Sequence, residues 1–522
     1  MVFKKKNNNL IATKKLFTTE LNYKDLHNNL YDNGLVFLEK DHVYANDLDL
    51  FGENSIFHFI NRCFSSYGCK CLANWLMNSA ASDEILERQA SISELSINIS
   101  FRTKIGIIGI QSRDNQKINK VTEWLGNTKS LKVLKSLSKI TFYFSLINIS
   151  LIILSLFNGL LIPIFILFLL FSYLYIYSYK WSKVKLLYDS ISKTDSDLKY
   201  YSNFLTIIED EKFTSPLLNK LKEELKINNI TVTKTIKSLQ NLIKWTDYRL
   251  NFFFQLSINT LFYTDIWLLL RIEKWKMQFG SQLVNWQNTI GQLEALVSFS
   301  ILHFNNPDWC VPTIEKEYHV QLLEAGHPLI PENDRITNSY EIDKLGCVDI
   351  ITGSNMSGKS TFLRTIGVNI VLAQAGANVC CKKMKISPLK LMTYMRIVDN
   401  MQDNTSTFYA EIKRLKNILE VSHNNEYVFL LLDELLRGTN SKDKTSGSIA
   451  IIKNIINNNS NAIIATHDLS ITNISQENYS NIRNFYFDIS ITEKKMHFDY
   501  KIKTGVCQST NASLLLKEIG IE

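Results

Sequence analysis

The sequence predicts an α + α/β fold, in which a helical part with an inserted apolar hairpin precedes a C-terminal α/β domain. Segments 49–139 and 180–305 carry Leu and Ile at helical spacing. Residues 140–179 contain no charged side chain. After Pro307 and Pro312, short β-rich runs alternate with helical segments, which is typical of a largely parallel sheet.

The composition is that of a folded chain with several domains. Its 522 residues exceed what one hydrophobic core usually holds, so roughly two to four domains are expected. Apolar residues make up 45% and charged residues 21%, which excludes wholesale disorder. The 7 Pro and 19 Gly exclude collagen-like and Pro-rich architectures. A net charge of +8 permits a polyanionic partner such as DNA or a lipid surface but does not require one.

The cysteines and the first residues favour a reducing compartment. The 8 Cys show no repeated CxxC pairing, so neither a zinc ribbon nor a disulfide framework is predicted. The start, MVFKKKNNNL, is basic but lacks an apolar run, so no cleavable secretory signal is expected.

The uncharged run from Ile140 to Tyr179 predicts a transmembrane hairpin. One helix crosses the hydrocarbon core with about 20 residues, so this run fits two crossings. Asn158-Gly159 is a natural turn, and Pro163 falls in the first turn of the second helix. Lysines at 132, 135, 139, 180, 183 and 185 predict that both ends lie on the cytoplasmic side of the inner (cytoplasmic) membrane. The alternative is a helical hairpin buried in a soluble domain.

A second apolar stretch, Asn251 to Leu270, favours a packed helix of the soluble part. Asp265 interrupts it and Arg271 follows it. An acidic residue near one end fits a buried helix as well as a membrane segment.

Five consecutive parts are predicted. An N-terminal extension covers 1–48 and the first helical part covers 49–139. The hairpin occupies 140–179, the second helical part 180–310, and the α/β domain 311–522.

A glycine-rich segment predicts a nucleotide site. Residues 353–360, GSNMSGKS, match the pattern GxxxxGK[ST], between a predicted strand Val348–Thr352 and a helix starting near Thr361. In such a loop, backbone N–H groups surround the phosphates and the helix N-terminus adds a favourable dipole. Lys359 would pair with the β- and γ-phosphates, and the Ser360 hydroxyl would join the Mg²⁺ shell.

Two further predicted strands end in residues suited to hydrolysis. Tyr427–Leu432 is followed by Asp433, expected near Mg²⁺, and Glu434, the candidate base for the attacking water. Ala462–Ala465 leads to His467. A lone His is more often structural, but this one follows a neighbouring strand at the edge where a γ-phosphate sensor would sit.

These motifs together resemble the MutS family of the ABC ATPase superfamily. TGSNMSGKST at 352–361 looks like the family's TGPNMGGKST, and STFYAE at 406–411 resembles its signature loop STFxxE. DELLRGT at 433–439 is similar to DEIGRGT, and ATH at 465–467 matches ATH. The resemblance extends upstream through EAGHPL at 324–329, LERQ at 86–89, and the segment 67–76.

The resemblance implies core and lever helices followed by an ABC-type P-loop ATPase domain that dimerises head to tail. It implies ATP and Mg²⁺ as cofactors, with Ser360 and Asp433 as metal ligands. Ser406 would act catalytically on the nucleotide of the other subunit, beside Glu434 and His467; the alternative is that Ser406 caps its own helix. The nucleotide-binding residues implied are Gly353, Asn355, Met356, Gly358, Lys359, Ser360, Thr361 and Asp443.

The chain also departs from the family pattern. Ser354 and Ser357 replace a Pro and a Gly of the phosphate loop, and Asn404 stands where the signature usually has Gly. Residues 1–48 are too few for the family's N-terminal mismatch-reading domain, and no helix-turn-helix tail is visible after the ATPase motifs. We expect a variant without that reading domain.

Two functions remain open from the sequence. One is a MutS-like DNA-dependent ATPase of the mismatch repair type, which binds mismatched or structured DNA and couples ATP hydrolysis to lever or clamp movement. The other is a membrane-tethered ABC-type ATPase without mismatch specificity, which acts on branched DNA or a protein partner. Both readings expect a homodimer, with the ATPase facing the cytoplasm.

Overall fold

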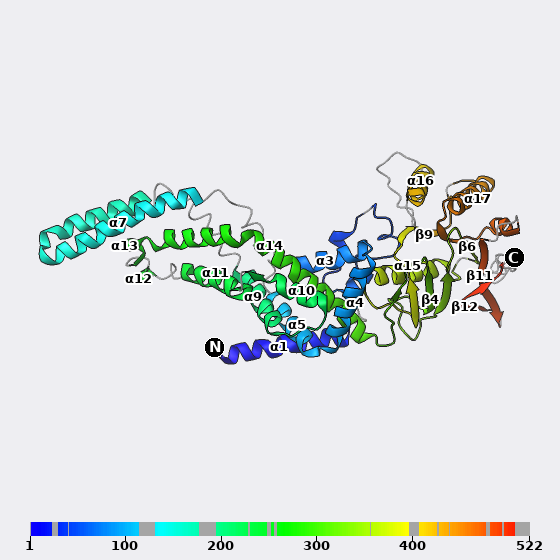
Figure 1. The fold of residues 1–522 in the computed structure, drawn as a ribbon, viewed down its shortest axis with the longest axis horizontal. Helices are drawn as coiled ribbons and strands as arrows, with labels where there is room; N and C mark the ends of the chain where they lie inside the picture. The colour runs from blue at the N-terminus through cyan, green and yellow to red at the C-terminus, as the bar shows by residue number, and fades with distance from the viewer. Residues whose placement is uncertain are drawn as a thin grey trace. The chain divides into compact units, whose positions relative to one another are not determined.

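The computed structural model describes residues 2–22, 30–39, 41–113, 131–176, 195–227, 230–247, 252–254, 258–354, 356–395, 407–424, 427–437, 439–476, 481–492 and 495–506. The chain forms two compact units, each assembled from segments far apart in the sequence (Figure 1). Unit 1 comprises 1–18, 63–68 and 98–294, and unit 2 comprises 19–62, 69–97 and 295–522. The five consecutive parts expected from the sequence stay a prediction.

Unit 1 is mainly helical. Its elements are most of α1 (Val2–Leu21), α5 (Ile99–Arg113), α7 (Leu131–Phe157), η3 (Gly159–Leu161), α9 (Asp195–Asp210), α10 (Pro216–Glu224), β1 (Lys226–Ile227), β2 (Ile230–Thr231), α11 (Val232–Asp247), α12 (Phe252–Phe254), α13 (Thr260–Phe262) and the first part of α14 (Thr264–Asn305). Helices α9 and α11 pack together and bury Ile236 of α11 with Phe204 and Ile208, which lie one turn apart on α9.

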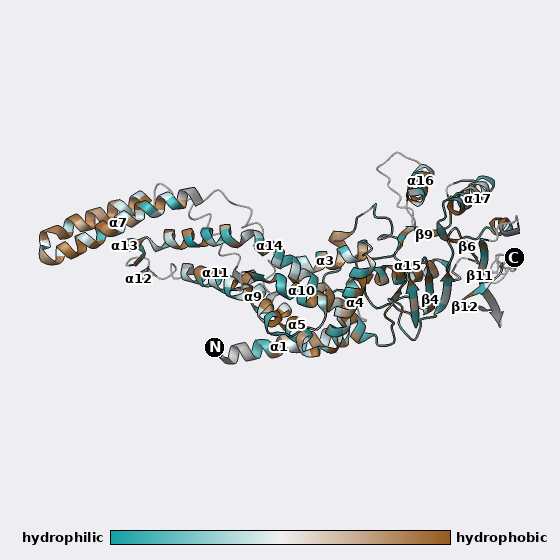
Figure 2. Cartoon of the chain, in the orientation of Figure 1, coloured by the Kyte–Doolittle hydropathy of each residue, from teal (hydrophilic) through white to brown (hydrophobic). Residues whose placement is uncertain are grey.

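The predicted hairpin is present as two helical segments of unit 1. Helix α7 ends at Phe157, and the Asn158 side chain accepts a hydrogen bond from the Leu160 N–H at 3.1 Å, which begins the return segment Gly159–Ile176. The Phe144 ring lies 5.7 Å from that of Phe168. Both segments are long and apolar enough to cross a membrane, and their side chains are largely exposed and hydrophobic (Figure 2). The flanking Lys180, Lys183 and Lys185 lie outside the described residues.

The prediction of one packed helix over 251–270 is wrong. Helices α13 and α14 are separated by Tyr263, whose backbone is left-handed with φ 51°. Burial is also uneven, because Leu269 is buried whereas Phe253 and Phe262 are exposed. The pattern of apolar residues carried no sign of this break.

Unit 2 combines helices with two sheets. Before the sheets come η2 (Leu35–Phe37), α2 (Ile56–Ile60), most of α3 (Ser66–Met77), α4 (Ser82–Ile97) and the end of α14. A four-stranded sheet has the order β3 (Thr313–Ile314), β7 (Lys383–Ile386), β4 (Val320–Ala325) and β5 (Asn338–Ile342). The mixture of a helical unit and a helix-and-sheet unit confirms the α + α/β class.

A six-stranded sheet organises the second half of unit 2. Its order is β12 (Lys495–Thr504), β11 (Ile482–Thr492), β6 (Val348–Thr352), β10 (Asn461–Ala465), β9 (Val428–Asp433) and β8 (Lys390–Tyr394). All neighbours are parallel except β11 and β12, which form an antiparallel hairpin. This confirms the largely parallel sheet. Its helices are α15 (Lys359–Ala375), α16 (Thr407–Asn424), α17 (Ser441–Asn457) and η6 (Leu469–Gln476).

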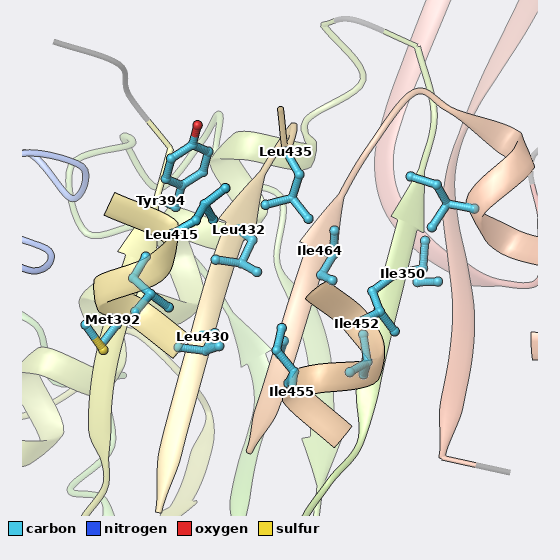
Figure 3. Close-up of a cluster of buried hydrophobic side chains, with 14 of the residues drawn as sticks. Ile350, Met392, Tyr394, Leu415, Leu430, Leu432, Leu435, Ile452, Ile455 and Ile464 are labelled. Atoms are coloured by element: carbon cyan, nitrogen blue, oxygen red, sulfur yellow. The ribbon is translucent and has the colours of Figure 1, made fainter. Parts of the chain in front are cut away.

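Helices cover this sheet because its strands are apolar on both faces. Leu430 and Leu432 of β9 pack toward Ile452 and Ile455 of α17 in one buried cluster, to which α16 and η6 also contribute (Figure 3). The alternate residue Phe429 faces the other way, with its ring 6.4 Å from that of Tyr340 in β5. Strands buried on both faces are typical of parallel sheets.

Residues 41–62, expected partly within an extension, belong to unit 2. Leu48 and Leu50 are fully buried. The buried Asp47 carboxylate accepts hydrogen bonds from Thr393 Oγ1 at 2.6 Å, from the Met395 N–H at 3.1 Å, and from Arg414 Nη2 at 2.7 Å. An early segment of the chain therefore completes the core around β8 and α16.

Candidate nucleotide-binding site

The candidate site lies at the carboxyl edge of the six-stranded sheet. Strand pairing sets Ala465 beside both Ile351 and Asp433, so β6, β10 and β9 end at the same level. Ligands of open parallel sheets bind outside the carboxyl ends of the strands. Residues that lie far apart in the sequence thus meet at one edge.

The phosphate loop between β6 and α15 requires unusual backbone conformations. Gly353 has φ 148° and Gly358 has φ 102°. A Cβ at Gly353 would lie 2.9 Å from Ser357 Oγ and 3.0 Å from the Phe487 carbonyl oxygen, so a side chain there would crowd the loop. Met356 also has a positive φ, and its side chain is exposed. Helix α15 begins directly after Gly358 and presents its N-terminus to the pocket.

Lys359 and Ser357 point to an anionic ligand. The buried Lys359 ammonium donates to the carbonyl oxygens of Gly353 and Ser354, at 2.8 Å each, so it is held across the loop. The Ser357 hydroxyl is buried and has no hydrogen-bond partner among the described residues. A phosphate oxygen bound in the loop would provide an acceptor for both groups.

Ser360 and Asp433 lie in direct contact. Ser360 Oγ donates to Asp433 Oδ2 at 2.6 Å, and burial raises the pKa of the Asp433 carboxyl. No cluster of three or more His, Cys, Asp or Glu side chains suited to a metal occurs in the described part of the chain. A hydroxyl and one carboxylate suit Mg²⁺, which usually keeps several waters and takes its remaining oxygen ligands from phosphates.

Glu434 lies between a histidine and an arginine. Its carboxylate is 3.3 Å from His467 Nδ1 and 3.3 Å from Arg437 Nε. The Glu434 backbone has φ 53°, and its N–H donates to the Ala465 carbonyl at 2.9 Å. A turn in this conformation directs the carboxylate into the pocket, whose lining includes Glu434. The group is thus positioned to accept a proton from a water molecule.

A pocket of about 400 Å³ is lined by Ser357, Lys359, Ser360 and Glu434, and by a wall that the sequence motifs did not predict. Ile336, Asn338 and Tyr500 line it opposite the start of α15. Asn338 Nδ2 donates to the Tyr500 carbonyl at 2.9 Å, and a Cβ at Gly358 would lie 3.0 Å from the Tyr500 ring. No local motif marks these three residues. The β11–β12 hairpin places Tyr500 next to the phosphate loop. Only the pairing of these two strands could have predicted this position from the sequence.

His327 also lines the pocket and is held neutral. Burial, with the nearby Arg364 as a second cause, lowers the pKa of His327 to about 4. Its Nδ1 accepts a hydrogen bond from the Leu329 N–H at 3.3 Å, which requires that nitrogen to be unprotonated.

Comparison with known proteins places these features in a family. The model of MutS domain V matches residues 349–515. Relatives named DNA mismatch repair protein MutS include those of Leptospira interrogans serovar Lai, 30% identical over 47% of this chain, and of Persephonella marina, 30% identical over 45%. That of Clostridium botulinum strain Hall is 32% identical over 42%. Residues 349–515 are therefore of the MutS domain V type.

The match covers a limited part of these MutS relatives. The aligned region spans 29% of the Leptospira protein, 27% of the Persephonella protein and 24% of the Clostridium protein. The MutS domain V match nevertheless includes the phosphate loop, Asp433, Glu434 and His467. The resemblance read from the motifs is therefore confirmed at the level of the family.

Of the remaining predicted site residues, two lie outside the described residues, one lines the pocket and one does not. Asn355 and Ser406 lie outside the described residues. Thr361 lines the pocket. Asp443 is in the first turn of α17, where its N–H donates to the capping Asn440 side chain at 2.9 Å, and it is not among the residues that line the pocket. The nucleotide-binding role predicted for Asp443 therefore does not follow from the geometry of this pocket.

Proposed function

We propose that this protein is a MutS-type ATPase that acts on DNA in mismatch repair. The observation that carries the proposal is that Lys359, Ser360 and Glu434 line one pocket, with Ser360 hydrogen-bonded to Asp433. The names of the relatives, which are DNA mismatch repair proteins, support DNA as the partner. A net charge of +8 is compatible with a polyanionic partner.

In this proposal, the phosphate loop and the N-terminus of α15 bind the phosphates of ATP, with Lys359 on the β- and γ-phosphates. Ser360 and Asp433 bind Mg²⁺, which supplies charge neutralisation of the phosphates when bound. Glu434 orients and deprotonates the attacking water, and His467 holds the Glu434 carboxylate. Tyr500, Asn338 and Ile336 offer a mixed apolar and polar wall for the nucleobase.

A second subunit completes the site in this proposal. Ser406 and its signature loop reach the nucleotide of the partner, and Asp443 on the exposed first turn of α17 lies at the subunit contact. The proposed contribution of Ser406 to the partner's site rests on the match of STFYAE, and that of the segment before Asp443 on the match of DELLRGT, to the family motifs.

The hairpin anchors the protein in the inner membrane, with the ATPase in the cytoplasm. Exposed apolar side chains along both helices support this, because water-exposed surfaces of soluble proteins rarely carry such extended apolar patches.

The test measures ATP turnover by the purified full-length protein, with homoduplex, mismatched and four-way DNA at a stated salt concentration. Stimulation of turnover by mismatched DNA above homoduplex is expected. Lys359→Ala, which removes the phosphate-binding cation, is the inactive control. If none of the three DNAs changes the rate of ATP turnover, DNA is refuted as the partner. Stimulation by four-way DNA alone would favour the membrane-tethered alternative without mismatch specificity.

A further inference from the structure

Residues 258–267, here called the docked segment, contact the hairpin from its base at Leu137 to Asn148. Tyr263 Oη donates to Ser172 Oγ at 2.5 Å, and Asn148 Nδ2 donates to the Leu261 carbonyl at 3.4 Å. Tyr263 and Ile266 also share a buried cluster with Leu137. Helix α13 lies beside the hairpin in Figure 1. Asn148 and Ser172, which lie in the uncharged run, both form hydrogen bonds with the docked segment.

The contact between Asn148 and Leu261 lies deep within the proposed membrane-crossing run, whereas Leu137 precedes that run. Asn148 follows Ile140 by eight residues and precedes Phe157 by nine. At a rise of about 1.5 Å per residue, Asn148 lies roughly 12 Å along the helix axis from Ile140 and roughly 14 Å from Phe157. The hydrocarbon core of a bilayer is about 30 Å thick. If the hairpin crosses the membrane, the docked segment reaches close to the midplane.

The outer surface of the docked segment is apolar. Ile258, Phe262 and Trp267 are 44%, 40% and 37% exposed, and the nearby Phe253 is 78% exposed. No charged residue occurs between 251 and 264, and Asp265 is buried against Asn259. A segment that covered the hairpin in water would turn a polar face outward. This surface instead suits acyl chains.

The break at Tyr263 is compatible with a membrane interior because its backbone donors have partners. The Tyr263 N–H donates to the Asn259 carbonyl at 2.8 Å, and the Asp265 N–H donates to the Asn259 side-chain oxygen at 3.1 Å. The Ile266 N–H donates to the Tyr263 carbonyl at 3.1 Å. Irregular backbone occurs at membrane depth where protein groups satisfy it.

We propose that the docked segment, with Phe253, is a re-entrant membrane element. It enters the bilayer alongside the hairpin, turns at Tyr263 and returns as α14, so its outer aromatic side chains contact lipid acyl chains. The inference rests on the proposed hairpin anchor and adds a third lipid-facing element to it.

Photo-crosslinking from single positions tests this inference. Benzoylphenylalanine replaces Phe253 or Phe262 in the full-length protein, reconstituted in phosphatidylethanolamine and phosphatidylglycerol vesicles, and mass spectrometry measures acyl-chain adducts. Phe157 at the hairpin turn is the positive control, and the exposed Tyr409 of unit 2 is the negative control. Adducts at Phe253 and Phe262 within a few-fold of those at Phe157, with background at Tyr409, are expected.

The outcomes separate the two proposals. Adducts at Phe157 with background at both Phe253 and Phe262 would overturn the re-entrant element and leave the hairpin anchor standing. Background at Phe157 as well would overturn the anchor and, with it, this inference. The unfolding temperature of each substituted protein checks that the replacement of one aromatic ring by another preserves the fold.

Discussion

At the residue scale, the candidate site divides into groups that spacing predicts and groups that it does not. Lys359, Ser360 and the Asp433-Glu434 pair follow recognisable patterns, because phosphate binding fixes their distance from glycines and strand ends. Tyr500 and Asn338 line the same pocket without such a pattern. Their positions depend on β-strand pairing and on burial, which short motifs do not encode.

Glu434→Gln should bind ATP but slow its turnover by about 10²-fold or more, since the amide cannot accept the proton of the attacking water. Steady-state phosphate release and equilibrium nucleotide binding measure the two effects separately. Glu223→Gln, an exposed change in the Lys226 ion pair of unit 1, is the matched control and should leave both unchanged. Wild-type turnover in Glu434→Gln would show that another group is the base.

Acid should destabilise unit 2 partly through His327. Because the pKa of His327 falls to about 4 in the folded protein from 6.5, the unfolded chain binds the proton more readily, and stability is lost as the pH falls through this interval. As the pH falls from about 7.5 to about 5, protonation of this histidine in the unfolded chain should lower the free energy of unfolding by up to about 2 kcal/mol. Thermal unfolding of wild type and His327→Gln across this range measures it. Identical pH slopes for the two proteins would contradict the prediction.

At the element scale, the strands were predictable and the broken helix was not. Val348–Thr352 was predicted to the residue and Ala462–Ala465 to within one residue, since buried parallel strands are short apolar runs between polar turns. The break at Tyr263 depends on Asn259, which caps the start of α14 through its side chain. These hydrogen bonds of the Asn259 side chain stabilise the break instead of a continuous helix, and they do not change the spacing of apolar residues in the sequence.

The hairpin should make the protein an integral membrane component. The full-length chain is expected to remain with membranes after carbonate extraction, because two uncharged helical segments are held in the bilayer by the hydrophobic effect. Deletion of 140–179 should release the protein while leaving nucleotide binding intact, since the site lies in unit 2. Recovery of the intact chain in the carbonate supernatant would contradict membrane integration.

At the scale of the whole molecule, hydrolysis should require two subunits. Lys359→Ala and Ser406→Ala proteins are each expected to be inactive, but a mixed dimer contains one site with both residues intact, so mixing should restore part of the activity. Phosphate release as a function of mixing ratio measures this. If heterodimers form and no activity returns, Ser406 acts within its own subunit, where capping its helix would contribute about 1 kcal/mol.

The division of unit 2 between early and late segments sets an order for its assembly during synthesis. Leu48 and Leu50 are made long before β12, which ends at Thr504, and the hairpin segments are complete at Ile176 in between. At about 5–20 residues per second, the ribosome needs on the order of half a minute to pass from the hairpin to β12. In the proposed anchored protein, insertion into the bilayer therefore precedes closure of the six-stranded sheet. Leu48 therefore lacks its neighbours in α15 and β9 until these elements have been synthesised, after the hairpin.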